Sequence, residues 1–286
     1  MRFVVIGHPI AHSLSPAMHS AAIAALGLAA TYEARDVRPE DLAAFVSDVR
    51  AGHFEGANVT IPHKVAVASL CDRLEEDARA IGAVNTLVVE RGAVVGTNTD
   101  VAGLFASLAP HASRLARGEV LILGAGGAAR AALAVARRLE ASVITIAARD
   151  RDKARALAEA APDVRAIALD DHERLARAFS AARLVIQASS ATMGPEAATF
   201  VSALPLDALS RDAVVTDLVY RPRRTALLAA VELRGLTTVD GTEMLVQQGA
   251  AALGRWLARP VEDLPIEAMR AAVLAALGHD GRQRLA

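Results

Sequence analysis

Short apolar runs alternate with amphipathic segments from the start of the chain, and this alternation predicts strands and helices in turn. The run from Phe3 to Ile6 has the length of a short buried strand and stops at a glycine. A helix is predicted from Ser15, read as its N-cap, and Pro16 through Leu26, because proline suits the first helical position. The next elements are predicted as a strand, a helix and a strand, over residues 31–34, 39–51 and 56–61. Strands that alternate with helices indicate βαβ units and a mainly parallel sheet.

The pattern changes between residues 83 and 95, where two apolar runs flank the tripeptide Glu90-Arg91-Gly92. So short a polar linker predicts a hairpin of antiparallel strands rather than a helical crossover. A helical segment then follows Asp100 and leads into a polar stretch. A domain boundary is therefore predicted near residues 101–118.

Strands and helices alternate again from Val120 onward. The predicted strands lie at 120–123, 142–147, 164–169, 184–189 and 214–220, and the helices between the first four end near residues 139, 160 and 181. A long helical pattern starts at Gly241, and a last amphipathic helix starts after Pro265. This second series predicts another α/β domain.

A glycine-rich turn joins the first strand and helix of the second series. Gly124, Gly126 and Ala129 form a GxGxxA pattern that follows a strand and opens a helix, which is the context that dinucleotide binding requires. Gly124 permits the tight turn, Gly126 lets a diphosphate approach the backbone, and the helix N-terminus offers free N–H groups and partial positive charge. The alternative is a glycine-rich turn that binds nothing.

Two domains are predicted from these patterns. Residues 102–239 form a Rossmann-type, doubly wound dinucleotide-binding domain. Residues 1–101, completed by the C-terminal helices of 240–286, form a substrate-binding and catalytic domain with a mainly parallel sheet. The substrate site is expected in a cleft between the two, because ligands of open α/β sheets bind beyond the carboxyl ends of the strands.

The end of the second strand in the dinucleotide domain bears on the choice between NADP and NAD. An NAD site carries Asp or Glu there, about 20 residues after the glycines, to bind the ribose 2′-hydroxyl. Here the strand ends at Ala148 without an acid, and Arg149, Arg151 and Lys153 follow. Cations at that place suit a 2′-phosphate, so NADP is predicted as the cofactor. Asp150 lies among the cations and keeps NAD open as the alternative.

Composition and charge exclude several classes of partner. Lys and Arg (31) nearly balance Asp and Glu (32), and aromatic residues make up 3%, so neither a polyanion nor single-stranded nucleic acid is expected to bind. The chain shows no signal peptide and no run that could span a membrane, so a cytoplasmic protein is expected. Cys71 is the only cysteine and the eight histidines show no metal-ligand spacing, so no metal is predicted. The expected partner is a small molecule, and a monomer and a homodimer both remain open.

Polar residues recur at the ends of the predicted strands of the first domain. They are Ser13, Ser15, Asn58, Thr60, Lys64, Asn85, Thr86, Asn98, Thr99 and Asp100. Each alone also fits a structural role, Ser15 as a helix cap and Asn98 and Asp100 as turn formers. His63 is assigned no catalytic role, because neighbours in an extended segment point to opposite faces, and Asn58 is expected to shape the turn.

Seven motifs in order resemble those of the shikimate dehydrogenase family. They are GHPIAHSLSP, GANVTIPHK, GAVNT, GTNTD, GAGGAAR, DLVYRP and GTEMLVQQG, and they span nearly the whole chain. Seven ordered motifs are much more specific than the glycine pattern alone. The resemblance implies the reversible, NADPH-dependent reduction of 3-dehydroshikimate to shikimate, a step of chorismate and aromatic amino-acid biosynthesis.

The resemblance also implies roles for particular residues of this chain. Lys64 and Asp100 would form the catalytic pair, with the lysine moving the proton. The substrate residues that it implies are Ser13 and Ser15 for the carboxylate, Tyr220 beside it, and Thr60, Asn85, Asp100 and Gln248 for the ring hydroxyls. The cofactor residues that it implies are Gly124, Ala125, Gly126, Gly127 and Ala128 for the diphosphate, Ala148, Arg149, Asp150 and Lys153 around the adenosine phosphate, and Leu218 and Gly241 beside the nicotinamide.

Two strand ends depart from the family pattern. Ala148-Arg149-Asp150 stands where the family often has Asn-Arg-Thr, which removes an amide and a hydroxyl and adds a negative charge. Gln187-Ala188-Ser189 stands where the family has Asn-Ala-Thr. Asp150 supports the nearest alternative, a quinate/shikimate dehydrogenase that uses NAD. An alternative of another class is a non-catalytic NADP-binding regulatory protein, which would be expected to lack Lys64 or Asp100.

Overall fold

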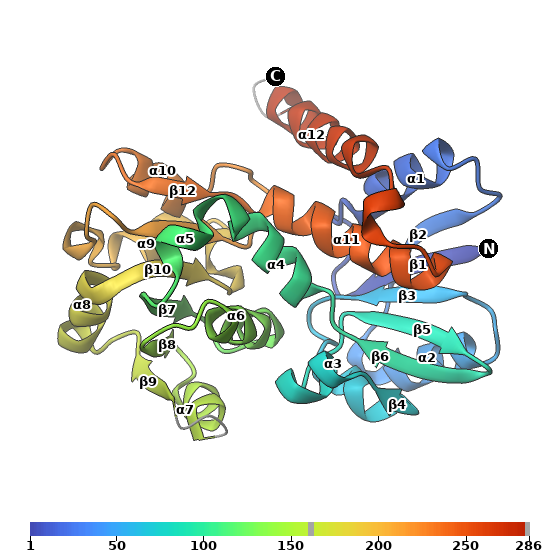
Figure 1. Ribbon diagram of the computed structural model, residues 1–286, viewed down its shortest axis with the longest axis horizontal. Coiled ribbons are helices and arrows are strands. Elements are labelled where there is room, and N and C mark those ends of the chain that lie inside the picture. Colours follow the sequence, from blue (N-terminus) through green and yellow to red (C-terminus); the bar gives the residue numbers. More distant parts are fainter. Residues whose placement is uncertain (160–162, 284–286) are drawn as a thin grey trace. The chain divides into compact units, whose positions relative to one another are not determined.

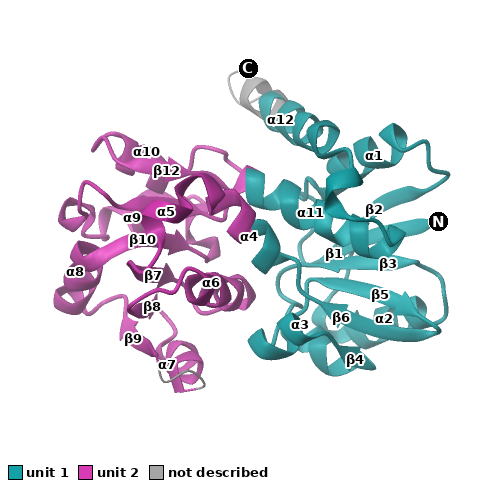
Figure 2. Cartoon of the chain, in the orientation of Figure 1, with its two compact units in different colours: residues 1–103, 243–286 teal, residues 104–242 magenta. Residues whose placement is uncertain are grey.

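The computed structural model describes residues 1–159 and 163–283, and the chain divides into two compact units. Unit 1 comprises residues 1–103 and 243–286, and unit 2 comprises residues 104–242 (Figure 2). The chain passes from one unit to the other inside α4 (Asp100–Leu108) and again at the start of α11 (Gly241–Leu257).

Unit 1 contains a six-stranded sheet in the order β2-β1-β3-β5-β6-β4 (Figure 1). Its strands are β1 Arg2–Gly7, β2 Thr31–Asp36, β3 Gly56–Val59, β4 Arg73–Leu74, β5 Thr86–Glu90 and β6 Ala93–Thr97. The pairs β1–β2, β1–β3 and β4–β6 are parallel, whereas β3–β5 and β5–β6 are antiparallel. The predicted mainly parallel sheet is therefore confirmed. The predicted hairpin is β5–β6, and its loop places Arg91 and Gly92 at positive φ values of 52° and 80°, as two-residue hairpin loops require.

Both faces of the central strands in unit 1 are covered. Phe3 and Val5 point into an apolar cluster with Trp256 of α11, whereas Val4 and Ile6 point into a larger cluster with residues of α2. Because β1 is buried on both sides, its apolar run is continuous rather than alternating. The other helices of the unit are α1 Ser15–Ala25, α2 Leu42–Arg50, α3 Glu76–Ile81 and α12 Ile266–Gln283, and α12 packs against α1.

Unit 2 contains a second six-stranded sheet, in the order β12-β11-β10-β7-β8-β9, whose pairs are all parallel. Its strands are β7 Glu119–Leu123, β8 Ile144–Ala148, β9 Val164–Ala168, β10 Ala182–Gln187, β11 Val214–Asp217 and β12 Thr237–Val239. The strand order reverses between β7 and β10, which is the doubly wound arrangement with its ligand-binding switch point. The predicted Rossmann-type fold is confirmed.

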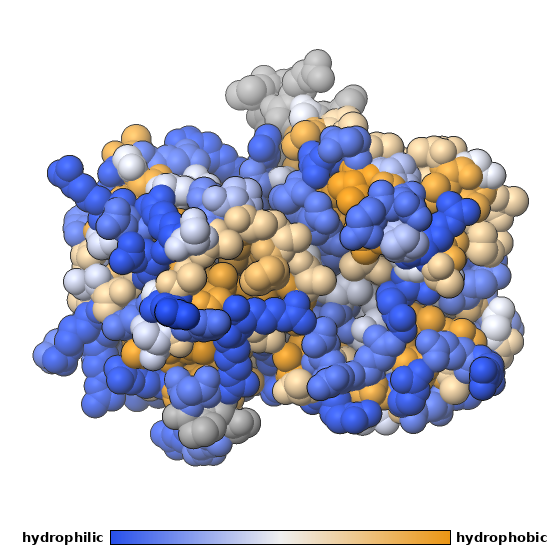
Figure 3. Space-filling view, viewed as in Figure 1, coloured by the Kyte–Doolittle hydropathy of each residue, from blue (hydrophilic) through white to orange (hydrophobic). Residues whose placement is uncertain are grey.

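Helices connect the parallel strands of unit 2. They are α6 Gly127–Arg138, α7 Arg151–Glu159, α8 His172–Ala181, α9 Ala197–Ser202 and α10 Ala226–Glu232, and a further short helix, α5 Ala112–Leu115, precedes β7. Short 3-10 helices occur in both units, at Pro39–Asp41, Ala66–Leu70, Ala109–His111, Ser190–Thr192, Leu206–Ala208 and Val261–Asp263. Within the described residues no helix is long and apolar enough to cross a membrane, and polar residues cover much of the viewed face (Figure 3).

Some local predictions are wrong. Ser15 does not cap α1, because the helix starts at Ser15 itself and the cap position, Leu14, makes no side-chain hydrogen bond. Instead, Ser13 Oγ accepts a hydrogen bond from the Ser15 N–H at 3.3 Å. Strands β4 and β12 were not predicted, because two or three residues are too few for a recognisable period.

Candidate functional site

Lys64 and Asp100 form an ion pair within unit 1. Lys64 lies in the segment that follows β3, and Asp100 is the first residue of α4. Lys64 Nζ lies 2.6 Å from Asp100 Oδ2, and the two side chains are 15% and 5% exposed. The partial positive charge at the N-terminus of α4 stabilises the Asp100 carboxylate. The Asp100 backbone N–H donates to Asn98 Oδ1 at 3.0 Å. The pair is therefore a shielded, charge-assisted hydrogen bond rather than a screened surface contact.

Asn85 connects this pair to Gln248 of α11. Asn85 Nδ2 donates to Asp100 Oδ1 at 2.9 Å and lies 3.4 Å from Gln248 Oε1. Asn85 Oδ1 accepts a hydrogen bond from the Thr99 N–H at 2.8 Å. Because a backbone N–H can only donate, this bond determines the orientation of the Asn85 side-chain amide. The structure thus brings together four of the residues singled out in the sequence, Lys64, Asn85, Asp100 and Gln248.

Ser13, Ser15 and Thr60 lie beyond the ends of β1 and β3, which are neighbours in the sheet. The Thr60 N–H donates to the Ile6 carbonyl at 2.9 Å, and a Cβ on Gly7 would lie 2.6 Å from Thr60 Cγ2. Only glycine at position 7 accommodates so close an approach. Within the described parts of the chain, no hydrogen bond links these three hydroxyl side chains to Lys64 or Asp100.

His63 and Asn58 both have structural contacts in unit 1. The buried His63 ring lies with Nε2 at 2.7 Å from the Val37 carbonyl oxygen. Asn58 was expected to shape the turn after its strand, and this is wrong. It lies inside β3, is 5% exposed, and its side chain bonds to Tyr32 and Thr86 on other strands.

A second buried histidine, His19 on α1, was not singled out in the sequence. Its ring stacks on Tyr32 at 4.2 Å between centroids, and neither ring nitrogen has a hydrogen-bond partner among the described residues. Burial lowers the pKa of His19 to about 3, and the neighbouring Asn58 amide offsets part of that shift. A protonated ring would be a buried charge without a partner.

The buried His19 should make the protein acid-sensitive. Between pH 6.5 and about 3 the unfolded chain binds a proton at this residue and the folded chain does not, so the free energy of unfolding falls as pH falls. Between pH 6.5 and 5 the expected loss from this group is about 2 kcal/mol. Urea unfolding of wild type and His19→Phe at several pH values measures it, and the variant should lose less stability over this window. Equal losses in the two proteins would rule out this role of His19.

The glycine-rich turn of unit 2 has the geometry of a phosphate cradle. Gly124 has φ of 123°, and a Cβ there would lie 3.1 Å from the Ala188 carbonyl oxygen, so glycine is required. Gly126 is the N-cap of α6, and a Cβ there would meet nothing within 4 Å. Open space faces Gly126 at a helix N-terminus, with Ala125 before it and Gly127 and Ala128 in the first turn. These residues fit a dinucleotide diphosphate.

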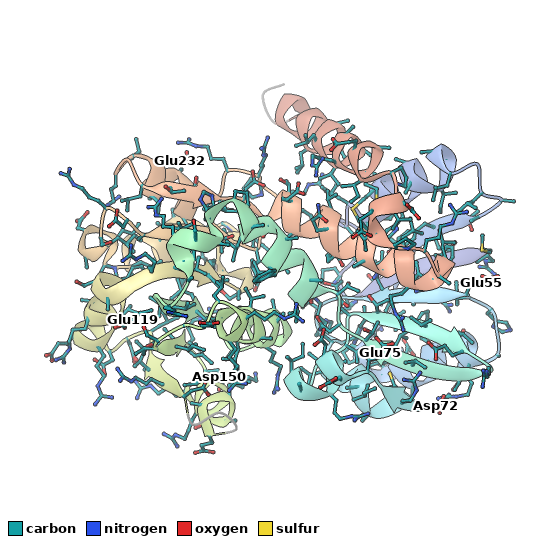
Figure 4. The ribbon with its side chains drawn as sticks, in the orientation of Figure 1. Glu55, Asp72, Glu75, Glu119, Asp150 and Glu232 are labelled. Atoms are coloured by element: carbon teal, nitrogen blue, oxygen red, sulfur yellow. The ribbon has the colours of Figure 1, made fainter. Side chains whose placement is uncertain are left out.

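The cations after β8 are not equivalent. Asp150, labelled in Figure 4, follows the end of β8. Its Oδ2 lies 2.9 Å from Lys153 Nζ, and its Oδ1 accepts from the Lys153 N–H at 3.0 Å. These bonds lower the pKa of Asp150. Arg151 pairs with Asp170 at 2.6 Å. Arg149, next to Ala148 at the strand end, is exposed and makes no ion pair with any residue that the structure describes. The charge of Lys153 is thus partly compensated, whereas that of Arg149 is not.

Leu218 and Gly241 approach each other closely in unit 2. A Cβ on Gly241 would lie 2.7 Å from the Leu218 carbonyl oxygen, so the start of α11 packs on the backbone that follows β11. Asp217, which sequence reasoning missed, anchors this backbone by accepting from the Thr225 hydroxyl at 2.7 Å and the Val219 N–H at 3.0 Å. Burial raises the pKa of Asp217 to about 6, against the effect of these donors. Tyr220 lies three residues after Asp217 and is half-buried.

Gln187, at the end of β10, has a side chain that is only partly satisfied. Its Oε1 accepts from the Ser189 N–H at 3.2 Å and from the Ser189 hydroxyl at 3.1 Å. Its Nε2 is buried with no partner among the residues described. In the same described part of the chain, no three His, Cys, Asp or Glu side chains are arranged to hold a metal ion.

Two family models match the chain. One, described as the shikimate dehydrogenase substrate binding domain, matches residues 5–87, and the other, described as the alanine dehydrogenase/PNT C-terminal domain, matches residues 103–221. A shikimate dehydrogenase (NADP(+)) of Methanopyrus kandleri is 44% identical over 281 residues, which cover 96% of this chain and 94% of that relative.

Solved structures match over both units. Shikimate 5-dehydrogenase from Thermus thermophilus, in complex with NADP(H) and shikimate, has a TM-score of 0.82 at 35% identity, covering 97% of this chain and 100% of that one. Quinate dehydrogenase from Corynebacterium glutamicum, in complex with NAD, has a TM-score of 0.83 at 28% identity, covering 96% and 99%.

Proposed function

Because this chain belongs to the shikimate dehydrogenase family, we propose that it is an NADP-dependent oxidoreductase that reversibly reduces 3-dehydroshikimate to shikimate. The family resemblance of the seven sequence motifs is confirmed by these relatives. The reaction is a step of chorismate and aromatic amino-acid biosynthesis.

The observation that carries the proposal is the shielded Lys64–Asp100 pair with Asn85 and Gln248 beside it. Reduction of a ring ketone needs a hydride on carbon and a proton on oxygen. Bound NADPH supplies the hydride. We propose that Lys64 Nζ donates the proton to the ketone oxygen and takes it back from the hydroxyl in the reverse direction. Asp100 orients the lysine through the 2.6 Å hydrogen bond.

The chemistry of position 64 supports this role. Lys64 and Lys153 are the only lysines in the chain, and every other cationic side chain apart from histidine is an arginine. A guanidinium does not give up its proton in proteins, whereas an ammonium can. A lysine at the shielded position of an arginine-rich chain therefore suits proton transfer rather than charge alone.

The remaining substrate contacts are also proposals. Ser13 and Ser15 donate their hydroxyls to the substrate carboxylate, and the Tyr220 phenol adds a further contact. Thr60, Asn85, Asp100 and Gln248 bind the ring hydroxyls, since an amide can donate to a hydroxyl or accept from it and a carboxylate can accept from it. The side-chain amides of Asn85 and Gln248 lie next to the Asp100 carboxylate, so hydrogen-bond donors and acceptors are both present beside Asp100.

For the cofactor, we propose that Gly124 to Ala128 hold the diphosphate of NADP at the N-terminus of α6. Arg149 binds the 2′-phosphate, with Lys153 beside it and Ala148 and Asp150 in contact with the adenosine end. Leu218 and Gly241 contact the nicotinamide through their backbones. The open space at Gly126 and the uncompensated charge of Arg149 support this assignment.

A second candidate function is a quinate/shikimate dehydrogenase that uses NAD. Asp150 favours it, because a carboxylate after the second strand can accept from ribose hydroxyls and it already compensates Lys153. The quinate dehydrogenase with NAD shares the fold. We further propose a cytoplasmic enzyme, monomeric or homodimeric, that binds small molecules and no nucleic acid.

One assay separates these functions. Purified protein is mixed with shikimate or quinate, each with NADP⁺ or NAD⁺, and absorbance of the reduced nicotinamide is followed. We expect kcat/KM to be highest with shikimate and NADP⁺. Higher kcat/KM with quinate and NAD⁺ would support the second candidate. No turnover in any combination, with NADP binding retained, would indicate a non-catalytic regulatory protein.

A further inference from the structure

Three polar side chains with no proposed substrate contact, Tyr32, Asn58 and Thr86, line one face of the sheet in unit 1. Asn58 of β3 and Thr86 of β5 are paired residues of antiparallel strands, so their side chains point to the same face. Tyr32 of β2 lies two strands from Asn58 on that face, because it pairs with Phe3 and Asn58 pairs with Val5. All three are at most 7% exposed, and Tyr32 belongs to the apolar cluster that contains Phe3 and Val5.

A continuous series of hydrogen bonds runs along this face to the catalytic pair. Tyr32 Oη lies 2.6 Å from Asn58 Oδ1, Asn58 Nδ2 lies 3.1 Å from Thr86 Oγ1, and Thr86 Oγ1 lies 3.0 Å from Asn85 Oδ1. Asn85 Nδ2 then reaches Asp100 Oδ1 at 2.9 Å, and Lys64 donates to the other oxygen of Asp100.

The direction of each bond follows from partners that have a single role. The Thr99 N–H can only donate, so the oxygen of the Asn85 amide faces it and the nitrogen faces Asp100. The Asn85 backbone carbonyl can only accept, so the nitrogen of Asn58, 3.4 Å away, faces it. Asn58 Oδ1 then accepts from Tyr32, and the Thr86 hydroxyl accepts from Asn58 and donates to Asn85. Every donor in the series points toward Asp100.

We propose that Thr86 and Asn58 are positioning residues for catalysis, which hold the Asn85 amide, and through it the Asp100 carboxylate, in the orientation that Lys64 requires. Buried hydrogen bonds in series strengthen one another, and an amide held at both ends loses the freedom to rotate. A small misplacement of a catalytic group costs far more in rate than in binding. This inference rests on the proposed function of Lys64 and Asp100.

The test removes one hydroxyl without changing shape. Thr86→Val deletes the donor to Asn85, and we expect kcat for shikimate oxidation to fall about tenfold while KM for shikimate changes less than about threefold. Thr86→Ser keeps the hydroxyl and should restore kcat to near the wild-type value. Both are measured with saturating NADP⁺, with the thermal midpoint recorded for each variant.

The chain offers a matched control for burial and shape. Thr97 of β6 pairs directly with Thr86 and is 5% exposed, but its side chain makes no hydrogen bond to a residue in the described part of the chain. Thr97→Val should therefore lower stability at most and leave kcat unchanged. If Thr97→Val and Thr86→Val lower kcat equally, packing rather than hydrogen bonding accounts for the effect and the proposal is wrong.

A double-variant cycle separates positioning from an independent effect. If Thr86 acts through Asn85, adding Thr86→Val to Asn85→Ala should change kcat less than about twofold further. A full tenfold further loss would overturn the proposal, as would a single Thr86→Val variant with normal kcat. Absence of shikimate turnover in the wild-type protein would instead contradict the proposed function, so the two failures are distinguishable.

Discussion

Replacing Lys64 with alanine should lower kcat for shikimate oxidation by about 1,000-fold while KM for shikimate stays within a few-fold. The ammonium is the only cation placed within hydrogen-bond distance of the Asp100 carboxylate among the described residues, and we propose that it carries the proton. The substrate contacts proposed for Ser13, Ser15 and Gln248 do not depend on it. Steady-state kinetics with varied shikimate at saturating NADP⁺ measures both constants.

Lys64→Arg is the control that separates charge from proton transfer. A guanidinium can keep an ion pair with Asp100 but does not release its proton, so kcat should be about as low as in Lys64→Ala. Because Asp100 would lose a shielded partner in the alanine variant, circular dichroism and the thermal midpoint should accompany the kinetics. A folded Lys64→Ala variant with kcat within tenfold of wild type would remove Lys64 from the mechanism.

Arg149→Ala should raise the Kd and KM for NADP⁺ by about 10- to 100-fold and leave those for NAD⁺ nearly unchanged. Hydrogen bonds to charged groups are worth about 1.5–3 kcal/mol, and only NADP carries the 2′-phosphate that Arg149 would bind. Lys153 cannot compensate fully, because Asp150 already pairs with it at 2.9 Å. Isothermal titration calorimetry gives the Kd without turnover, and kinetics gives the KM.

Arg177→Ala is the matched control for net charge. Arg177 is an exposed arginine on α8 of the same unit, paired with Glu173 at 2.7 Å. It should leave the affinity for both cofactors unchanged. If Arg149→Ala weakens NADP⁺ and NAD⁺ equally, Arg149 does not read the 2′-phosphate.

Residues close together in the sequence produced the most accurate predictions. The two apolar runs around Arg91 and Gly92 predicted the β5–β6 hairpin, because a two-residue loop leaves no other geometry. The spacing of Gly124 and Gly126 before a helical pattern predicted the β7–α6 turn. In that turn Gly124 has a positive φ, which favours glycine. By contrast, Ser15 followed a cap pattern and lies inside the helix, since local propensity did not decide which residue began it.

The candidate site depends on sequence motifs and on contacts that only the tertiary structure makes. Lys64, Asn85, Asp100 and Gln248 were singled out from motifs far apart in the chain, but their hydrogen bonds depend on strand order and on the position of α11. The prediction for Asn58 is wrong because the contacts of its side chain also depend on strand pairing. Its side chain is directed by its pairing with Thr86 across β3 and β5, and no pattern within GANVTIPHK contains that register.

The sequence by itself determined the α/β class, the doubly wound second unit, the family and the residue types available for chemistry, because periodicity, glycine positions and motif order are local properties of the chain. Only the tertiary structure decided which polar residues meet. It paired Lys153 with Asp150, left Arg149 without an ion pair among the described residues, and joined Tyr32, Asn58 and Thr86 to the Lys64–Asp100 pair. Hydrogen bonds act over about 3 Å, so they depend on which strands are neighbours and in which register, and a linear pattern of residue types carries neither.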